Sequence, residues 1–176
     1  MRILLAAAAV LVAVAGASAD TKVALTGENT KITFVGTKSD GKHEGGFKSV
    51  SGSINVAGDD LTTLSIKVDI DMNSLWSDNE KLTGHLKADD FFGVKDHPKA
   101  TFTSTKVTKS DKGYLIAGDL TIRGKSKPIS LEAEVSTTDG FKLTSDFKID
   151  RTQFGMEYGK GKIDDVTSLK VVVGSK

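Results

Sequence analysis

Apolar and polar residues alternate along most of the chain, and this period of two is typical of half-buried β-strands. The clearest run is Leu64–Met72, where every second residue is apolar and the residues between are Ser, Lys or Asp. Seven other runs alternate in the same way. The sequence therefore predicts about eight strands, at Thr30–Lys38, Phe47–Ala57, Leu64–Met72, 100–104, Tyr114–Ile122, Ile129–Val135, Phe141–Ile149 and Val166–Val173.

Short turn sequences separate several of these runs, among them Ser39-Asp40-Gly41, Asp111-Lys112-Gly113 and Thr138-Asp139-Gly140. Asp and Gly are favoured in tight turns, and connections this short favour antiparallel neighbours, because a parallel crossover needs a dozen or more residues. The sequence thus predicts one all-β domain. A closed barrel is favoured over a two-sheet sandwich, because closure removes exposed edges and can enclose a small ligand.

The alternation stops between Asp78 and Pro98, which we call the helical segment. Its first part contains helix formers such as Glu80, and we expect a short helix capped by Asp78. Its second part contains the pair Phe91-Phe92. Two adjacent phenylalanines in a polar segment are expected to be buried, because removal of each ring from water stabilises the folded state by about 2–3 kcal/mol. The pair is therefore expected to fix the helical segment to the barrel rim, where one of the rings can also line an apolar channel.

The first nineteen residues are expected to be a signal peptide and not part of the fold. Arg2 provides a positive charge, 3–14 is continuously apolar, and Ala17-Ser18-Ala19 matches an A-x-A cleavage site before Asp20. The apolar run is too short to span a bilayer, and no Cys follows the cleavage site, so no lipid anchor is expected there. These features predict a periplasmic or secreted protein without stable membrane insertion, whose domain occupies residues 20–176.

Composition excludes several classes of function. The 24 Lys and Arg residues nearly balance the 23 Asp and Glu residues, so no basic surface favours nucleic acid. Cysteine is absent, which removes thiol nucleophiles, thiolate metal sites and disulfides. No G-x-S-x-G elbow and no glycine-rich phosphate loop occurs in the sequence.

The histidines and paired carboxylates leave catalytic and metal-binding hypotheses open but weakly supported. His85 and Asp89 are four residues apart and could share a helical face, but their spacing matches no strong zinc motif. In the simpler interpretation His85 bonds a backbone group. Doublets such as Asp89-Asp90 are better explained as turn and cap residues than as acid-base pairs. We therefore expect no catalytic residue, no metal and no cofactor.

Several short motifs, taken in order, resemble the YceI-like family of secreted lipid-binding domains. The matching residues are Asp78-Asn79-Glu80, His85-Leu86, Asp90-Phe91-Phe92, Pro98, 102–105, 118–124, Lys127-Pro128-Ile129, Arg151, Phe154-Gly155 and Asp165-Val166. Two departures, Leu82-Thr83-Gly84 before His85 and an opening strand without tryptophan, leave ligand identity and length open.

The resemblance implies an eight-stranded antiparallel lipocalin-like β-barrel with one short helical segment over it. It also implies a non-enzymatic carrier or store of a long isoprenoid, either an isoprenoid quinone or a polyprenyl lipid, held in the barrel lumen. A homodimer is left open. The side chains expected at the lumen and its mouth are Ile54, Val56, Ile66, Val68, Ile70, Phe91, Phe92, Phe102, Ile116, Leu120, Phe141, Phe147, Leu169 and Val171.

Two other functions remain as alternatives. One is a secreted enzyme that uses His85 and a carboxylate at the barrel mouth. The other is a ligand-free module that binds a protein through an edge strand. Periodicity alone cannot distinguish a hollow lumen from a packed core, because both place apolar residues on the inner face.

Overall fold

One sheet of eleven strands forms most of the molecule in this computed structural model, which describes residues 19–174. The predicted signal peptide therefore lies, except for its last residue, outside the described residues. The strands are β1 (Thr21–Thr26), β2 (Thr30–Lys38), β3 (Gly41–Phe47), β4 (Val50–Val56), β5 (Ser65–Asp71), β6 (Leu75–Ser77), β7 (Lys99–Ser110), β8 (Gly113–Ile122), β9 (Lys125–Ser136), β10 (Lys142–Asp150) and β11 (Val166–Gly174). Short 3-10 helices occur at η1 (Leu61–Thr63), η2 (Met72–Ser74) and η3 (Arg151–Phe154).

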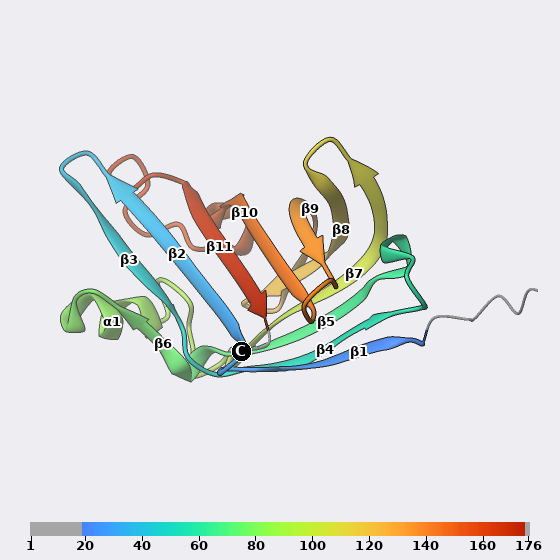
Figure 1. The fold of residues 1–176 in the computed structure, drawn as a ribbon. Coiled ribbons are helices and arrows are strands. Elements are labelled where there is room, and N and C mark those ends of the chain that lie inside the picture. The colour runs from blue at the N-terminus through green and yellow to red at the C-terminus, as the bar shows by residue number, and fades with distance from the viewer. Residues whose placement is uncertain (1–18, 175–176) are drawn as a thin grey trace, which may run out of the picture.

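The strands follow the order β1-β4-β5-β7-β8-β9-β10-β11-β2-β3-β6, and every ladder between them is antiparallel. The sheet curls strongly, so that β2, β3 and β11 stand opposite β4, β5 and β7 (Figure 1). The ladder between β9 and β10 is short, joining three residue pairs, and the sheet bends there. The result is a curled half-barrel with one apolar face turned inward.

The prediction of an all-β fold with antiparallel strands and one helix is confirmed, whereas the number of eight strands is wrong. The missing elements are β1, β3 and β6. The sequence of β3, GKHEGGF, ends in its one large apolar residue, so it carries no alternating signal. β6 has only three residues. β3 and β6 are therefore specified by pairing with their neighbours rather than by a periodic pattern.

Sharp corners separate β3 from β4 and β5 from β6, which otherwise follow each other almost directly in the chain. Only Lys48 and Ser49 separate β3 from β4, and only η2 separates β5 from β6. The two corners are joined by backbone hydrogen bonds from Lys48 N to Ser74 O (3.3 Å) and from Asp71 N to Ser49 O (3.1 Å). Here the two arms of the sheet are connected by the polypeptide chain as it passes through the corners, and not by hydrogen bonds between neighbouring strands.

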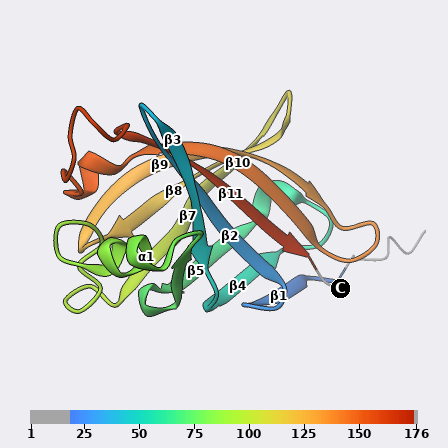
Figure 2. The same ribbon diagram turned by 90° about the vertical axis from the view of Figure 1, so that its left-hand side faces the viewer.

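The helix α1 (Glu80–Lys87) lies at one end of the curled sheet, beside β6 (Figures 1 and 2). Its N-cap is Asn79, whose Oδ1 accepts a hydrogen bond from Leu82 N at 3.0 Å. The prediction that Asp78 caps the helix is therefore wrong. Asp78 instead accepts hydrogen bonds from Glu44 N and His43, because the chain has not yet turned into the helix at that point. Within residues 19–174, no helix is long and apolar enough to cross a bilayer.

Two glycines allow aromatic rings to lie flat on the inner face of the sheet. A Cβ atom at Gly118 would come within 2.5 Å of the Phe102 ring and of the Thr103 carbonyl oxygen. A Cβ atom at Gly45 would collide in the same way with the Phe34 ring. The rings therefore occupy space that a side chain on the next strand would otherwise fill, which leaves the interior of the curl open.

The close approach at Gly118 predicts that Gly118→Ala destabilises the fold. The added methyl would overpack the ring and the backbone oxygen, and we expect the free energy of unfolding to fall by about 1–3 kcal/mol. Gly41→Ala is the matched control, because a Cβ atom there meets nothing within 4 Å, and it should change stability by less than about 0.5 kcal/mol. Urea unfolding followed by circular dichroism measures both values. Equal stabilities of the two variants would contradict the packing of Phe102 on Gly118.

Candidate ligand-binding cavity

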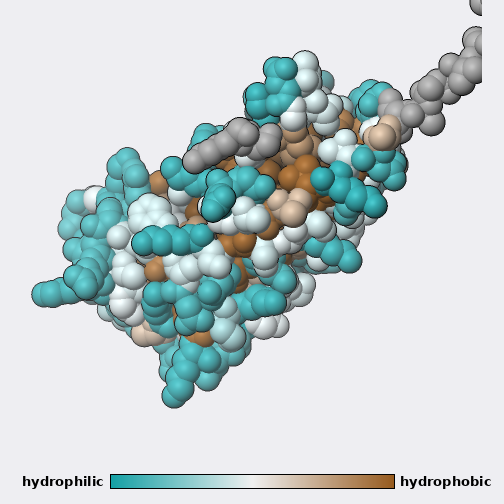
Figure 3. Space-filling model, turned by 60° about the horizontal axis from the view of Figure 1, so that its bottom comes forward, coloured by the Kyte–Doolittle hydropathy of each residue, from teal (hydrophilic) through white to brown (hydrophobic). Residues whose placement is uncertain are grey.

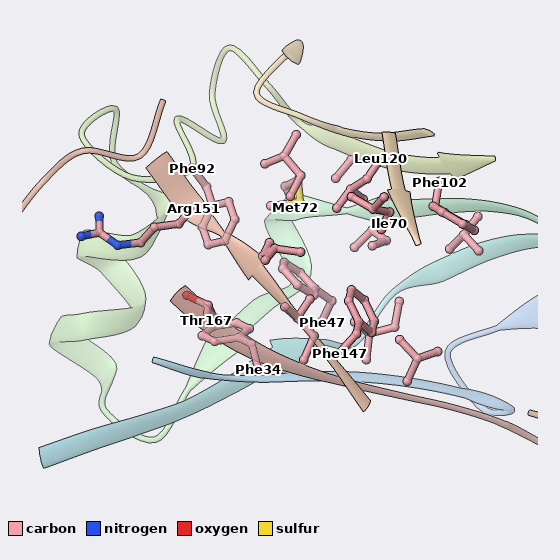
Figure 4. Close-up of a pocket in the computed structure, with 18 of the residues that line it drawn as sticks. Phe34, Phe47, Ile70, Met72, Phe92, Phe102, Leu120, Phe147, Arg151 and Thr167 are labelled. Carbon is pink, nitrogen blue, oxygen red and sulfur yellow. The ribbon is translucent and has the colours of Figure 1, made fainter. Parts of the chain in front are cut away.

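A cavity of about 370 Å³ lies inside the curl of the sheet. Its volume falls in the range of roughly 300–1,000 Å³ that is typical of small-molecule sites. The wall consists almost entirely of aliphatic and aromatic side chains, which project inward from strands on both arms of the sheet (Figure 4). The helical segment adds Leu82, Leu86, Phe91 and Phe92 to this wall.

All but three of the lumen residues expected from the sequence line the cavity. Those that do are Ile54, Ile66, Val68, Ile70, Phe91, Phe92, Phe102, Leu120, Phe147, Leu169 and Val171. Val56, Ile116 and Phe141 do not line it. They are nearly inaccessible (exposed fractions of 1%, 0% and 5%) and belong to the packed part of the core, where facing side chains fill the interior. Alternation identified the inward face correctly but not where along the strands the interior is open.

The exposure of inward-facing residues indicates that the cavity is hollow. Phe47, Val68, Phe147 and Val171 face the interior, yet each is only partly buried. In a filled core these large side chains would lose nearly all contact with solvent. Apolar side chains are also visible in a hollow on one face of the molecule, framed by hydrophilic side chains (Figure 3). The open space therefore communicates with the surface.

An aromatic cluster stands where the helical segment meets the sheet. The ring centroids of Phe34, Phe47 and Phe92 are separated by 6.0–6.5 Å, and the Phe47 and Phe92 rings meet edge to face. Phe91 is buried with Leu75 and Leu86 in a cluster against which these three rings also pack. Phe91 and Phe92 thus fix the helical segment to the sheet, and both line the cavity. Phe34 lies in the strand predicted at Thr30–Lys38 but is not among the side chains expected at the lumen.

Several other wall residues lie outside regular strands or next to them, among them Met72, Arg151, Met156 and Ile163. Met72 ends the alternating run Leu64–Met72 but is not among the side chains expected at the lumen. The other three lie in segments without a periodic signal, so alternation could not select them for the cavity wall. Arg151 was quoted only as part of the family motif. Its place in the structure explains why an arginine stands there.

The guanidinium of Arg151 holds the segment 155–165 over one end of the cavity. It donates to the backbone oxygens of four residues and to the carboxylate of Asp165, which together use all five of its N–H donors. The four carbonyl partners are Met156 (2.5 Å), Tyr158 (2.9 Å), Asp164 (3.0 Å) and Ile163 (3.1 Å). Arg151 is 5% exposed, so these contacts replace water around a buried cation. Because every donor is occupied, Arg151 cannot also bind an anionic ligand without giving up a partner.

A second arginine joins the two segments that border this end of the cavity. Arg123 Nη1 donates to Phe91 O of the helical segment (2.6 Å) and to Gly155 O of the segment 155–165 (2.9 Å). Arg123 itself lies in a turn and has a positive φ of 52°. The next residue, Gly124, also has a positive φ, of 69°. We call the helical segment, the segment 155–165 and these two arginines the mouth of the cavity.

His85 lies at the mouth but does not line the cavity. Its Nε2 is 2.7 Å from Asp90 Oδ2, so its partner is a side chain and not the backbone group expected from the sequence. Its ring meets Phe91 and Tyr158 edge to face, with centroids 4.9 and 4.6 Å apart. These contacts give His85 a structural role between the helical segment and the segment 155–165. Within residues 19–174, no three side chains of metal-binding type come together.

The β2–β3 hairpin adjoins the mouth, where His43 Nδ1 lies 2.9 Å from Oδ1 of Asp78, the first residue of the helical segment. The backbone N–H of Glu44 and the His43 ring stabilise the charged form of the Asp78 carboxyl and lower its pKa. Lys38, also in this hairpin, contacts Asp40 at 3.2 Å and lowers the pKa of that carboxyl. Lys38 and His43 thus each have a carboxylate beside them.

Comparison with known sequences places relatives among bacterial proteins named UPF0312. A UPF0312 protein of Photorhabdus laumondii is 35% identical over 91 residues, which cover 52% of this chain and 47% of the relative. Another, of Vibrio campbellii, is 34% identical over 116 residues, which cover 65% of this chain and 60% of the relative. The chain thus matches about half the length of the first of these relatives.

Solved structures share the fold. Burkholderia cenocepacia BcnA superposes with a TM-score of 0.77 at 22% identity, covering 84% of this chain and 96% of that one. A polyisoprenoid binding domain from Saccharophagus degradans gives a TM-score of 0.67 at 16% identity, covering 86% and 95%. The Campylobacter jejuni YCEI protein gives 0.61 at 28% identity, covering 75% and 84%. The family model of the YceI-like domain matches residues 23–174, nearly all of the described chain, and this protein therefore belongs to the YceI-like family.

Proposed function

We propose that this protein binds a long isoprenoid lipid in the cavity and carries or stores it without chemical change. The observation that carries the proposal is a hollow, apolar cavity of about 370 Å³ inside the sheet. An isoprenoid quinone or a polyprenyl lipid supplies the matching chemistry, because most of its surface is apolar chain. The name of the Saccharophagus degradans domain, which has the same fold, points to the same class of ligand.

Burial of apolar surface accounts for affinity in such a site. Each methylene-sized group removed from water contributes about 0.8 kcal/mol, so ten such groups contribute roughly 8 kcal/mol before the cost of ordering the chain. Directional hydrogen bonds are not needed for this term. Discrimination among apolar chains is then expected to depend on length and width, which the walls of the cavity set.

Location outside the cytoplasm, in the periplasm or the surroundings of the cell, fits this role. The proposal rests on the A-x-A site before Asp20 and the apolar run that precedes it. A water-filled compartment between membranes offers no other apolar medium for an isoprenoid. A protein that shields the chain from water would allow the lipid to cross it.

The first prediction is that purified protein retains its lipid. An organic extract of protein expressed with its native leader and isolated without detergent should contain an isoprenoid at close to one molecule per chain, identified by mass spectrometry. Delipidated protein should take up added quinone or polyprenol. If neither a native isoprenoid nor uptake is found, the carrier proposal fails, and capture of a protein partner would then favour the interaction module.

The second prediction concerns the cavity wall. Leu169→Trp places a larger ring in the hollow part of the interior, where Leu169 is only partly buried, so the fold should persist while the lipid loses space. We expect affinity for the isoprenoid to fall at least tenfold, which corresponds to about 1.4 kcal/mol. Displacement of a fluorescent lipid from delipidated protein measures this change.

Lys170→Trp is the matched control, because it adds the same ring to the exposed face of the same strand. It should bind lipid as the parent does. Thermal unfolding of both variants establishes that they are folded. Parent-like affinity of a folded Leu169→Trp protein would show that the lipid binds elsewhere.

A further inference from the structure

The polar side chains that line the cavity differ in whether they already have a partner within the protein, and this difference bears on the ligand's headgroup. The side chains among them that are charged, or become charged on protonation, are Lys38, His43 and Arg151. Lys38 and His43 each face a carboxylate, and the five N–H donors of Arg151 are all used within the protein. None of the three therefore offers an unmatched positive charge to a ligand.

Most of the hydroxyl groups on the wall are also occupied. Thr30 Oγ1 donates to Asn29 Oδ1 at 2.9 Å, and Ser145 Oγ donates to Glu132 O at 2.6 Å. Thr37 Oγ1 donates to Asp164 Oδ2 at 2.5 Å. These groups stabilise the wall itself and have no free proton to give.

Thr167 is the exception. Its side chain lines the cavity from β11, and among residues 19–174 its hydroxyl has no hydrogen-bond partner. Its oxygen lies near the end of the cavity beside α1, on the same side as the Arg151 guanidinium (Figure 4). Gly36, which also lines the cavity, leaves open space, because a Cβ atom there would meet nothing within 4 Å. The mouth therefore contains one hydroxyl that no other group of the described residues engages.

We propose that Thr167 Oγ1 contacts the headgroup of the isoprenoid and that this headgroup is uncharged, with a carbonyl or hydroxyl oxygen that accepts the Thr167 proton. This inference rests on the proposed function and specifies the class of ligand. A single hydroxyl satisfies a quinone carbonyl or an alcohol oxygen. The isoprenoid chain then extends from Thr167 along the apolar wall.

A polyprenyl phosphate is disfavoured at the same position. Its charge would stand where Lys38, His43 and Arg151 already have partners and where the carboxylates of Asp164 and Asp165 repel an anion. A charge moved into such a site without a partner is costly. The same chain with a neutral headgroup avoids this cost.

The test compares headgroups on chains of one length. Delipidated full-length mature protein is titrated with an isoprenoid quinone, a polyprenol, a polyprenyl phosphate and a headgroup-free polyprene hydrocarbon, by displacement of a fluorescent lipid. We expect the quinone, the polyprenol or both to bind at least tenfold more tightly than the phosphate. Thr167→Val, which replaces the hydroxyl by a methyl, should weaken binding of the preferred neutral ligand about two- to tenfold, as expected for one neutral hydrogen bond. It should leave hydrocarbon binding unchanged.

Thr33→Val is the matched control, because Thr33 lies on the neighbouring strand β2 and does not line the cavity. It should leave the affinities for all four ligands unchanged. Phosphate binding as tight as that of the neutral ligands overturns the inference, as does a Thr167→Val protein with parent-like affinity for them. In both cases the proposed function still holds if the hydrocarbon binds and the Leu169→Trp substitution weakens that binding. Failure of all four ligands to bind overturns both.

Discussion

The guanidinium of Arg151 is the interaction on which the mouth of the cavity depends. The segment 155–165 contains no strand, so its carbonyl groups cannot be satisfied by a ladder. A single buried arginine donates hydrogen bonds to four of them, because its planar fork presents five donors in fixed directions. Lysine at this position would offer three donors on one atom and would leave carbonyl groups unpaired. The segment can therefore cover the cavity without regular secondary structure.

Arg151 also explains how a buried cation and an apolar wall occupy the same place. Its charged end faces the backbone of the segment 155–165, whereas its side chain lines the cavity. Arg123 extends this arrangement to the helical segment through Phe91 O and Gly155 O. Residues of the family motif that are far apart in the chain thus meet in one network. Their role is to position the mouth, and this accounts for polar residues beside a cavity whose wall is mostly apolar.

The sequence predicted the inner face of the sheet well, because a period of two specifies which side chains of a strand share a face. Ile66, Val68 and Ile70 line the cavity as expected. Alternation could not predict β3. Its Gly45 leaves room for the ring of Phe34, and this requirement comes from the neighbouring strand β2 rather than from the sequence of β3 itself. Alternation also could not identify Thr167 as a wall residue of interest, because a polar residue on the inner face is unusual only once its lack of a partner is known. The mouth depends on contacts between segments that are distant in sequence, and no local pattern encodes them.

The size of the hollow is itself an argument that the folded protein is occupied. Cavities left by truncated core residues in another protein cost about 24 cal/mol per Å³, and at that rate an empty apolar space of about 370 Å³ would cost about 9 kcal/mol. This is comparable with the entire stability of an ordinary domain, about 5–15 kcal/mol. Solvent access lowers the cost, but water gains few hydrogen bonds from a wall of Ile, Val, Leu and Phe side chains. A ligand chain that fills the space restores the missing contacts and stabilises the folded state by mass action. Under the proposed function, retention of lipid and stability of the fold are therefore coupled through the same wall residues.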